Sequence, residues 1–251
     1  MAQAPARMLV YTKNGQGYVH QNIPAAVQAL QQLGSSAGLA VDVSDDPAVF
    51  TEAGLQRYAL LVFANTNNDV FDSDAERLAF RRYLEAGGGV VGIHSVLGTE
   101  RRWPWFRMML GGTFNWHAPF QAFSVRRIDR RHPSVQNLPD EWRTHDEFYF
   151  LKDMHPGIHV VLAGDVRTLG PDDSARVRQS AIPFNDLYPV AWSHDFDGGT
   201  VWVTTLGHDA RDYQDPTFLS LLRGGLAWVA GRARPLEPRA AYATGRDAPV
   251  R

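Results

Sequence analysis

The sequence predicts an α/β protein with a doubly wound, mostly parallel sheet that is extended by antiparallel strands. In the first half of the chain, short apolar runs alternate with longer segments of helical periodicity. This order is typical of right-handed β–α–β crossovers between parallel strands. In the second half, apolar runs follow one another with fewer helices between them, and a "DGG" turn joins two of them. Such a turn is typical of an antiparallel hairpin.

Four buried strands and three helices are expected in the first half. The strands are predicted at residues 7–12, 39–44, 59–66 and 90–94, and the helices at 23–34, 51–58 and 73–86. Asn22 is expected to cap the first helix, with Pro24 in its first turn. Ser73 and Glu76 form an S-x-x-E capping box at the start of the third helix. The apolar character of the third strand indicates that both faces of the sheet are covered.

The second half is expected to extend the same sheet. The expected elements are a short aromatic helix at 103–112, strands at 122–128 and 158–165, a hairpin at 189–208 and a closing helix at 215–231. Asp215 and Pro216 fit the start of that closing helix. We therefore expect one domain over residues 1–232. Residues 233–251 are rich in Pro, Arg and Ala and are expected to form a loosely ordered tail.

Composition excludes several classes of function. The formal net charge is −2 and the basic residues are mostly scattered, so we expect no nucleic-acid partner. No apolar run approaches the roughly 20 residues that a membrane span needs, and the N-terminal residues lack the pattern of a secretory signal. A cytoplasmic location without membrane contact is therefore expected. The chain contains no cysteine, which excludes disulfides, thiolate metal sites and cysteine nucleophiles.

Polar residues at the carboxyl ends of the parallel strands are the first candidates for a functional site, because doubly wound sheets bind ligands there. His94 follows the fourth strand in "GIHSVLG", at a turn where many α/β enzymes carry a Ser or Cys nucleophile. Ser95 is displaced by one residue from that position and is expected to be a turn residue. His20 ends the loop after the first strand, Asn65 follows the third, and His208 follows "VWVTTLG".

Aromatic residues suggest a flat-faced ligand such as a sugar. His117 lies in "GGTFNWHAPF", beside Trp116 and downstream of Trp103. Tryptophan rings stack on sugar faces, but they are equally typical of core or interface packing. Both interpretations of Trp103 and Trp116 stay open at this point.

The acidic pair Asp146 and Glu147 in "THDEFYF" has two interpretations as well. Burial within the aromatic stretch would raise the pKa of a carboxyl group toward the range of a general base. Alternatively, Asp146 caps a turn and Glu147 pairs with an arginine. The residues alone do not favour either interpretation.

Four segments together resemble the ThuA-like family, which is named for trehalose utilisation. They are "GGGVVGIHSVLGTE", "WPWFRMMLGGTFNWHAP", "DRRHPSVQNLPDEWRTHDEFYF" and "PVAWSHDFDGGTVWVTTLGHDARDYQDPTFLSLLRGGLAW". The resemblance implies a flavodoxin-like fold of the class I glutamine amidotransferase-like superfamily. In the glutamine amidotransferases the sharp turn after the corresponding strand, called the nucleophile elbow, carries a cysteine, and His94 stands at the matching position. Without a cysteine the chain is not expected to be a glutamine amidotransferase.

The resemblance also assigns site residues and a substrate class. It places the family's histidines at His20, His94, His117 and His208 and its acidic residue at Glu147. It further implies carbohydrate catabolism alongside oxidoreductases that make 3-keto sugars. We therefore expect a small-molecule sugar as the partner, and the aromatic segments suggest a homodimer.

Three hypotheses of function follow. The first is an enzyme that acts on a 3-keto disaccharide or glycoside by proton transfer, leading to isomerisation, elimination or hydration. It assigns catalysis to His94, Glu147 and His208, and substrate binding to His20, Asn65, His117, Trp116 and Trp103. The second is a metal-dependent hydrolase whose candidate ligands are His20, His94, His117 and His208. The third is a non-catalytic carbohydrate-binding protein. Of the three hypotheses, only the metal-dependent hydrolase requires a cofactor, which is a divalent metal ion.

Overall fold

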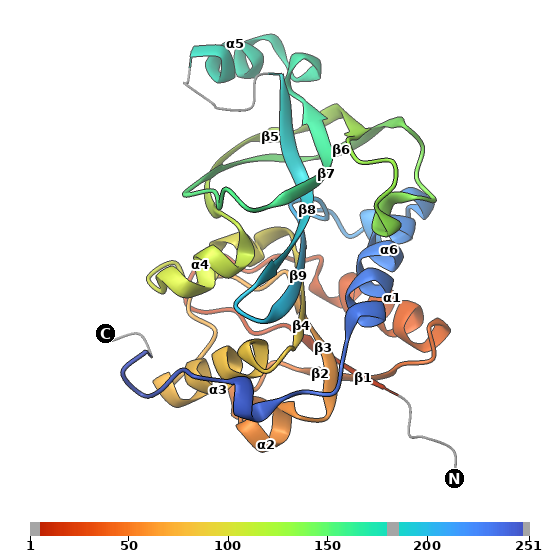
Figure 1. Cartoon of the computed structure of the whole chain (residues 1–251). Helices are drawn as coiled ribbons and strands as arrows, with labels where there is room; N and C mark the ends of the chain where they lie inside the picture. The colour runs from red at the N-terminus through yellow and green to blue at the C-terminus, as the bar shows by residue number, and fades with distance from the viewer. Residues whose placement is uncertain (1–5, 180–185, 248–251) are drawn as a thin grey trace.

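A nine-stranded mixed sheet forms the centre of the structure, which is a computed structural model that describes residues 6–179 and 186–247. The strand order is β2-β1-β3-β4-β9-β8-β7-β5-β6 (Figure 1). The strands are β1 (Arg7–Tyr11), β2 (Ala40–Ser44), β3 (Tyr58–Ala64), β4 (Gly89–Ile93), β5 (Thr113–Arg127), β6 (Glu141–Lys152), β7 (His159–Asp165), β8 (Leu187–Phe196) and β9 (Gly199–Thr204). The helices are α1 (Ile23–Ser36), α2 (Glu52–Leu55), α3 (Asp74–Glu85), α4 (Pro104–Leu110), α5 (Pro171–Gln179) and α6 (Pro216–Arg232).

The sheet has two halves that differ in strand direction. In the parallel half, β2, β1, β3, β4 and β9 are paired in parallel. In the antiparallel half, β8, β7, β5 and β6 are each antiparallel to the preceding strand in the sheet order. The predicted architecture of a parallel sheet with an antiparallel extension is confirmed.

Helices cover both faces of the parallel half. Alternation along β1 sends Met8 and Val10 into the core beneath α1 and α6, and sends Leu9 and Tyr11 into the core beneath α3 and α4. Figure 1 shows these helix pairs on opposite sides of the strands. Each fully buried aliphatic side chain contributes about 1.5–3 kcal/mol relative to exposure. The apolar runs in the sequence are therefore explained by burial on two faces.

The antiparallel half differs most from the sequence-based expectation. Strand β6 was not predicted, β5 begins nine residues before the expected residue 122, and α5 was also missed. Strand β6 lies at the edge of the sheet, and its first half alternates between exposed and partly buried positions. Glu141, Arg143 and His145 occupy the exposed positions, so the segment lacks an apolar run.

The helix starts agree with the sequence in two of three cases. Ser73 and Glu76 form the expected capping box of α3, and Asp215 accepts backbone N–H bonds at the start of α6. Asn22, however, makes no capping bond at the start of α1. Its amide is directed instead toward the loop after β9.

The residues after α6 run along α3 (Figure 1). The backbone N–H groups of Tyr242 and Ala243 donate to Oε2 of Glu85, and Arg82 donates to the carbonyl of Ala243. Residues 248–251 of the expected tail lie outside the described residues. That this segment is loosely ordered in solution stays a prediction.

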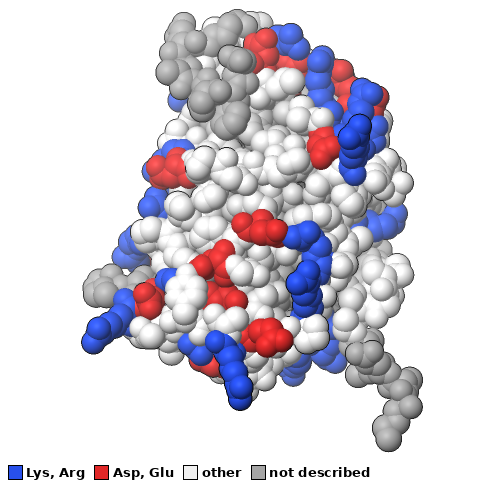
Figure 2. Space-filling model, viewed as in Figure 1, with Lys and Arg blue, Asp and Glu red and all other residues white. Residues whose placement is uncertain are grey.

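Charges are mixed on the face of the molecule that Figure 2 shows, where basic and acidic side chains lie interspersed. Among the described residues, no helix is both long enough and apolar enough to cross a membrane.

Candidate active site

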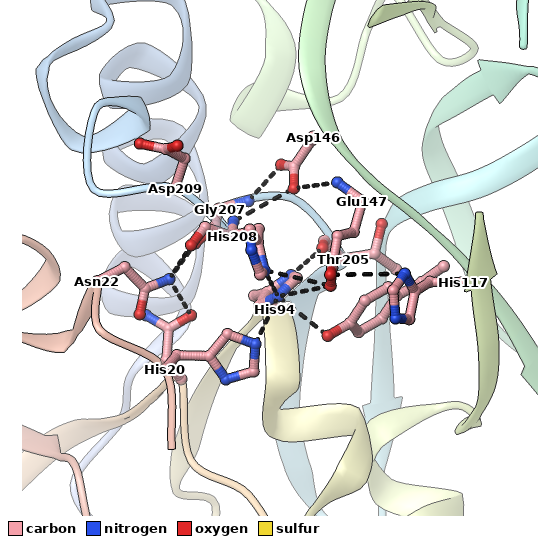
Figure 3. Close-up of polar contacts among 12 residues, drawn as sticks. His20, Asn22, His94, His117, Asp146, Glu147, Thr205, Gly207, His208 and Asp209 are labelled. Carbon is pink, nitrogen blue, oxygen red and sulfur yellow. Dashed lines mark hydrogen bonds and ion pairs between the residues drawn. The ribbon is translucent and has the colours of Figure 1, made fainter. Parts of the chain in front are cut away.

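His94 occupies a sharp turn at the carboxyl end of β4, as the sequence predicts. Its backbone has a φ of 52°, a left-handed conformation that costs a non-glycine residue about 1–3 kcal/mol. The five residues after β4, beginning with His94, form a short 3-10 turn. The turn presents the fully buried imidazole of His94 to the loops after β1 and β9 (Figure 3).

The tautomer of His94 follows from its hydrogen bonds. Its Nδ1 lies 2.7 Å from the carbonyl oxygen of Thr205. A carbonyl can only accept a hydrogen bond, so Nδ1 carries the hydrogen atom and donates. Nε2 therefore carries a lone pair, and it lies 3.2 Å from Nε2 of His20 and 3.3 Å from Nδ1 of His208. The hydroxyl of Tyr149 donates to the same nitrogen at 3.0 Å. His94 is thus the centre of a cluster of three imidazoles.

Glu147 brings a carboxylate to this cluster from β6. Its Oε2 lies 3.2 Å from Nδ1 of His208 and 3.8 Å from Nε2 of His94, and its Oε1 lies 3.5 Å from Nδ1 of His117. Of the two interpretations of Glu147, the structure does not support the pairing with an arginine, because its partners among the described residues are imidazoles. His117 lies on β5, beside Tyr149 of β6 in the strand register.

Burial and charge set the protonation states of the cluster. Burial lowers the pKa of His20 to about 4 and that of His94 well below its usual value. The hydrogen bond to Glu147 raises the pKa of His208. Burial would raise the pKa of Glu147, but its hydrogen bond to His208 and the charges of His208 and His117 lower it overall. At neutral pH His20 and His94 are therefore neutral, and the anionic carboxylate of Glu147 lies beside His208.

The side chain of Asp146 points away from the side chain of Glu147 and binds the backbone of the loop that carries His208. It accepts N–H bonds from Gly207 at 2.7 Å, from His208 at 3.3 Å and from Glu147 at 2.7 Å. Burial raises the pKa of Asp146 to about 8, the Asp212 carboxylate adds to the rise, and the backbone bonds oppose it. The predicted rise in pKa thus applies to the buried Asp146 rather than to Glu147.

Asn22 and Asn65 hold the same loop from the other side. Asn22 donates to the carbonyls of Gly207 at 2.6 Å and His208 at 2.8 Å, which explains why it does not cap α1. It also donates to Oδ1 of Asn65, whose own amide donates to Tyr213. Asn65 was expected to bind substrate, but it is fully buried and bonded within the protein, so it positions the loop instead.

A cavity of about 350 Å³ opens beside the cluster. It is lined by Tyr18, His20, Asn67, Ser95, Gly98, Arg101, Phe114, His117, Glu147 and Tyr149. His94 is not among these residues, so it lies behind the wall of the cavity. Tyr149 was not among the predicted site residues. Strand alternation places it on the same side of β6 as Glu147, but this signal requires that β6 be recognised as a strand.

The two tryptophans expected to bind a sugar lie elsewhere. Trp103 is buried in the aromatic core with Phe71 and Phe106, and Trp116 stacks on Phe150 at 4.2 Å. Neither lines the cavity. Their core-packing interpretation is the one that these positions support. Aromatic rings cover Trp103, and the ring of Phe150 and the guanidinium of Arg176 cover Trp116, so the ring faces that a sugar would need are occupied.

The cluster fits a divalent metal ion. His20, His94, Glu147 and His208 each offer one ligand atom, and these atoms lie within 4.8 Å of one another. Zinc–nitrogen bonds of about 2.0–2.1 Å imply neighbouring ligand atoms about 3.4 Å apart in a tetrahedral site, close to the observed 3.2 and 3.3 Å. The Thr205 carbonyl on Nδ1 of His94 is the kind of outer contact that orients a ligating histidine. His117, the fourth predicted ligand, is not part of this set.

Solved structures show which fold this is. A ThuA-like protein from Bacteroides uniformis is 23% identical, with a TM-score of 0.73 over 95% of this chain and 97% of its own. A ThuA-like protein from Parabacteroides merdae is 20% identical, with a TM-score of 0.69 over 90% of each chain. A GMP synthase protein from Thermoplasma acidophilum is 10% identical, with a TM-score of 0.52 over 92% of this chain and 96% of its own.

These similarities and the turn at His94 define an α/β protein of the class I glutamine amidotransferase-like fold with a histidine at the elbow. The model of the ThuA family, described as trehalose utilisation, matches residues 7–229. The chain belongs to the ThuA family. No curated protein matches the chain.

Proposed function

We propose that this protein is an enzyme of carbohydrate catabolism that removes a proton from a carbon next to the keto group of a 3-keto disaccharide or glycoside. Isomerisation and elimination proceed through this step, and hydration of the unsaturated product of elimination proceeds through its reverse. The observation that carries the proposal is the position of Glu147. Its carboxylate lies in the wall of a sugar-sized cavity and contacts the imidazoles of His208 and His117.

The surroundings of Glu147 suit a base. A keto group acidifies the neighbouring C–H bond, and an anionic carboxylate can accept that proton. The lowered pKa keeps Glu147 anionic at neutral pH. His117 is partly exposed at the cavity and can exchange protons with substrate oxygens, while His94 is too deeply buried to reach substrate. His94 therefore acts through its neighbours, as a positioning residue.

Exchange of carbon-bound hydrogen tests this proposal. The protein is incubated with 3-ketotrehalose in deuterated water, and the sugar is followed by NMR. Deuterium next to the keto carbon, or a rearranged or cleaved product, is the expected result for the wild type. A sugar that stays protonated and intact for hours would contradict the proposal.

The second candidate function is metal-dependent hydrolysis at the same cluster, and the proximity of the four ligand atoms favours it. A bound divalent ion would supply Lewis-acid polarisation and an activated water molecule. His20, His94, His208 and Glu147 would hold the ion, and His117 would stay free for proton transfer. Elemental analysis of the purified protein, with His94→Ala as the control, tests this candidate. Absence of stoichiometric metal from the wild type after incubation with Zn²⁺ would exclude it.

The third hypothesis, a non-catalytic carbohydrate-binding protein, has less support. It requires aromatic side chains in an open groove without convergent histidine and carboxylate groups. The burial of Trp103 and the contacts of Glu147 argue against it. We also propose that the protein acts in the cytoplasm, in keeping with two solved structures of similar fold from Salmonella typhimurium, each 12% identical, that are described as cytoplasmic proteins.

A further inference from the structure

Ser95 has a buried hydroxyl without a partner at the wall of the cavity. The residue is 3% exposed, and its Oγ makes no hydrogen bond to any described residue. It nevertheless belongs to the lining of the cavity that also contains Glu147. Buried hydroxyl groups are nearly always hydrogen-bonded, so an exception calls for an explanation.

Other buried serines of the chain follow the usual rule. Ser193 bonds to Nε2 of His132 at 3.1 Å, and Ser174 donates to the carbonyls of Val166 and Leu169. Neither of these serines lines the cavity beside the histidine cluster. The unpaired hydroxyl and the position at the cavity thus coincide in Ser95.

The backbone explains how Ser95 reaches the cavity. Ser95 directly follows His94, whose left-handed φ of 52° turns the chain sharply at the end of β4. In this turn the imidazole of His94 contacts the buried cluster, and the next residue, Ser95, forms part of the lining of the cavity. A left-handed backbone and an unpaired buried hydroxyl both lower the stability of the fold. A bound molecule that accepts a hydrogen bond from the hydroxyl would offset the second of these costs.

We propose that Ser95 binds the substrate and donates a hydrogen bond to its keto oxygen. This inference rests on the proposed function. When Glu147 accepts the proton, the C–H electron pair forms a C=C bond and the C=O π pair moves to oxygen. The oxygen becomes more negative in that step, and a donor already placed beside it stabilises the transition state more than the ground state. Ser95 is therefore assigned as a catalytic residue of the cavity wall.

Paired substitutions test the inference by activity and stability together. Ser95→Ala is expected to lower kcat about 10²-fold, the usual cost of removing one such donor, with a smaller change in KM. Its Tm is expected to equal or exceed that of the wild type, because no hydrogen bond is lost. Ser193→Ala, the matched control, is expected to lower Tm and leave kcat unchanged. An unchanged kcat in Ser95→Ala would overturn the inference, whatever its Tm.

Chemical labelling tests access to Ser95 without any substrate. Because the chain has no cysteine, Ser95→Cys introduces a single thiol, which is treated with a small methanethiosulfonate reagent. The thiol of Ser95→Cys is expected to react at least ten times faster than that of the buried control Ser193→Cys, since only the former faces the cavity. Equal rates would overturn the inference, because a side chain that small molecules cannot reach cannot bind substrate.

The two experiments separate this inference from the proposed function. A wild type that does not turn over keto sugars contradicts the proposed function and, with it, the assignment of Ser95 to a keto oxygen. Selective labelling of Ser95→Cys with the unchanged Tm of Ser95→Ala would then still support Ser95 as a ligand-binding residue. Turnover by the wild type together with full activity of Ser95→Ala leaves the proposed function standing and contradicts only the role of Ser95.

Discussion

The two halves of the sheet contribute to the site in different ways. The parallel half supplies His20, His94 and His208 from loops that follow β1, β4 and β9. The antiparallel half supplies His117 and Glu147 from within β5 and β6. The parallel half thus provides imidazoles in fixed positions, and the antiparallel half provides the carboxylate that lines the cavity. The proposed proton transfer needs both contributions, so the candidate site exists only where the two halves meet.

The largest effect is expected from Glu147→Gln, which leaves the imidazoles in place and removes the base. We expect kcat/KM to fall about 10³-fold, within the range typical of general-base removal, while Tm changes little. Steady-state kinetics on a 3-keto disaccharide measure this effect. Glu141→Gln, an exposed position on the same strand that pairs with Arg126, is the control. Full activity of Glu147→Gln would contradict the role of Glu147 as the base and, with it, the contribution assigned to the antiparallel half.

A smaller loss is expected from Asp146→Asn, which weakens the connection between the halves. The side-chain oxygens of Asp146, in β6, accept N–H bonds from Gly207 and His208 in the loop after β9. An amide offers one acceptor oxygen in place of two, so the loop shifts. We expect a 10- to 100-fold loss of activity, as is typical for residues that orient a site. Asp195→Asn, exposed on β8 and paired with Arg232, should keep full activity.

The pH dependence of metal binding tests the ligand set in the parallel half. The pKa of His208 is raised by Glu147, so His208 must lose a proton when an ion binds, whereas His20 and His94 are already neutral. Affinity for Zn²⁺ is therefore expected to fall about ten-fold per pH unit below the pKa of His208. Calorimetry in buffers of different ionisation enthalpy, between about pH 6 and pH 8, measures the released proton. Binding that is independent of pH would exclude His208 as a ligand.

The smallest effect on activity is expected from Asn22→Ala. The substitution removes the donor to the carbonyl of His208 and to Oδ1 of Asn65, whereas the carbonyl of Gly207 still accepts from the hydroxyl of Tyr213. This should lower the free energy of unfolding by about 1–3 kcal/mol and activity only a few-fold, because Asp146 still holds the loop. Urea denaturation and kinetics on the same preparation test both statements. A loss of activity as large as that of Asp146→Asn would contradict the statement that Asp146 is enough to hold the loop.

The halves also differ in how well the sequence predicts them. Strands β1, β3 and β4 are buried on both faces, so the apolar runs predict them to within a few residues. Strand β2 is an edge strand without a fully buried residue, and its alternating valines predict it instead. Strand β6 is an edge strand with charged and histidine residues at its exposed positions, and nothing in its first half resembles a buried strand.

The site shows the same contrast. The rule that ligands bind at strand ends found His20, His94 and His208, because each loop follows a recognisable strand. It could not find Tyr149, which lies within the unrecognised β6, and it did not foresee that Asn22 holds the His208 loop. Trp103 was misleading, because stacking on a sugar and packing in a core require the same side chain.

A kinetic isotope effect measured under single-turnover conditions tests whether the cavity removes a proton from carbon. The substrate is a 3-keto disaccharide that carries deuterium on the carbon next to the keto group. We expect the wild type to react several-fold more slowly with the deuterated sugar, because breaking that C–H bond is the step that Glu147 accelerates. Equal rates for the two sugars, with product formed from both, would contradict proton abstraction at this site.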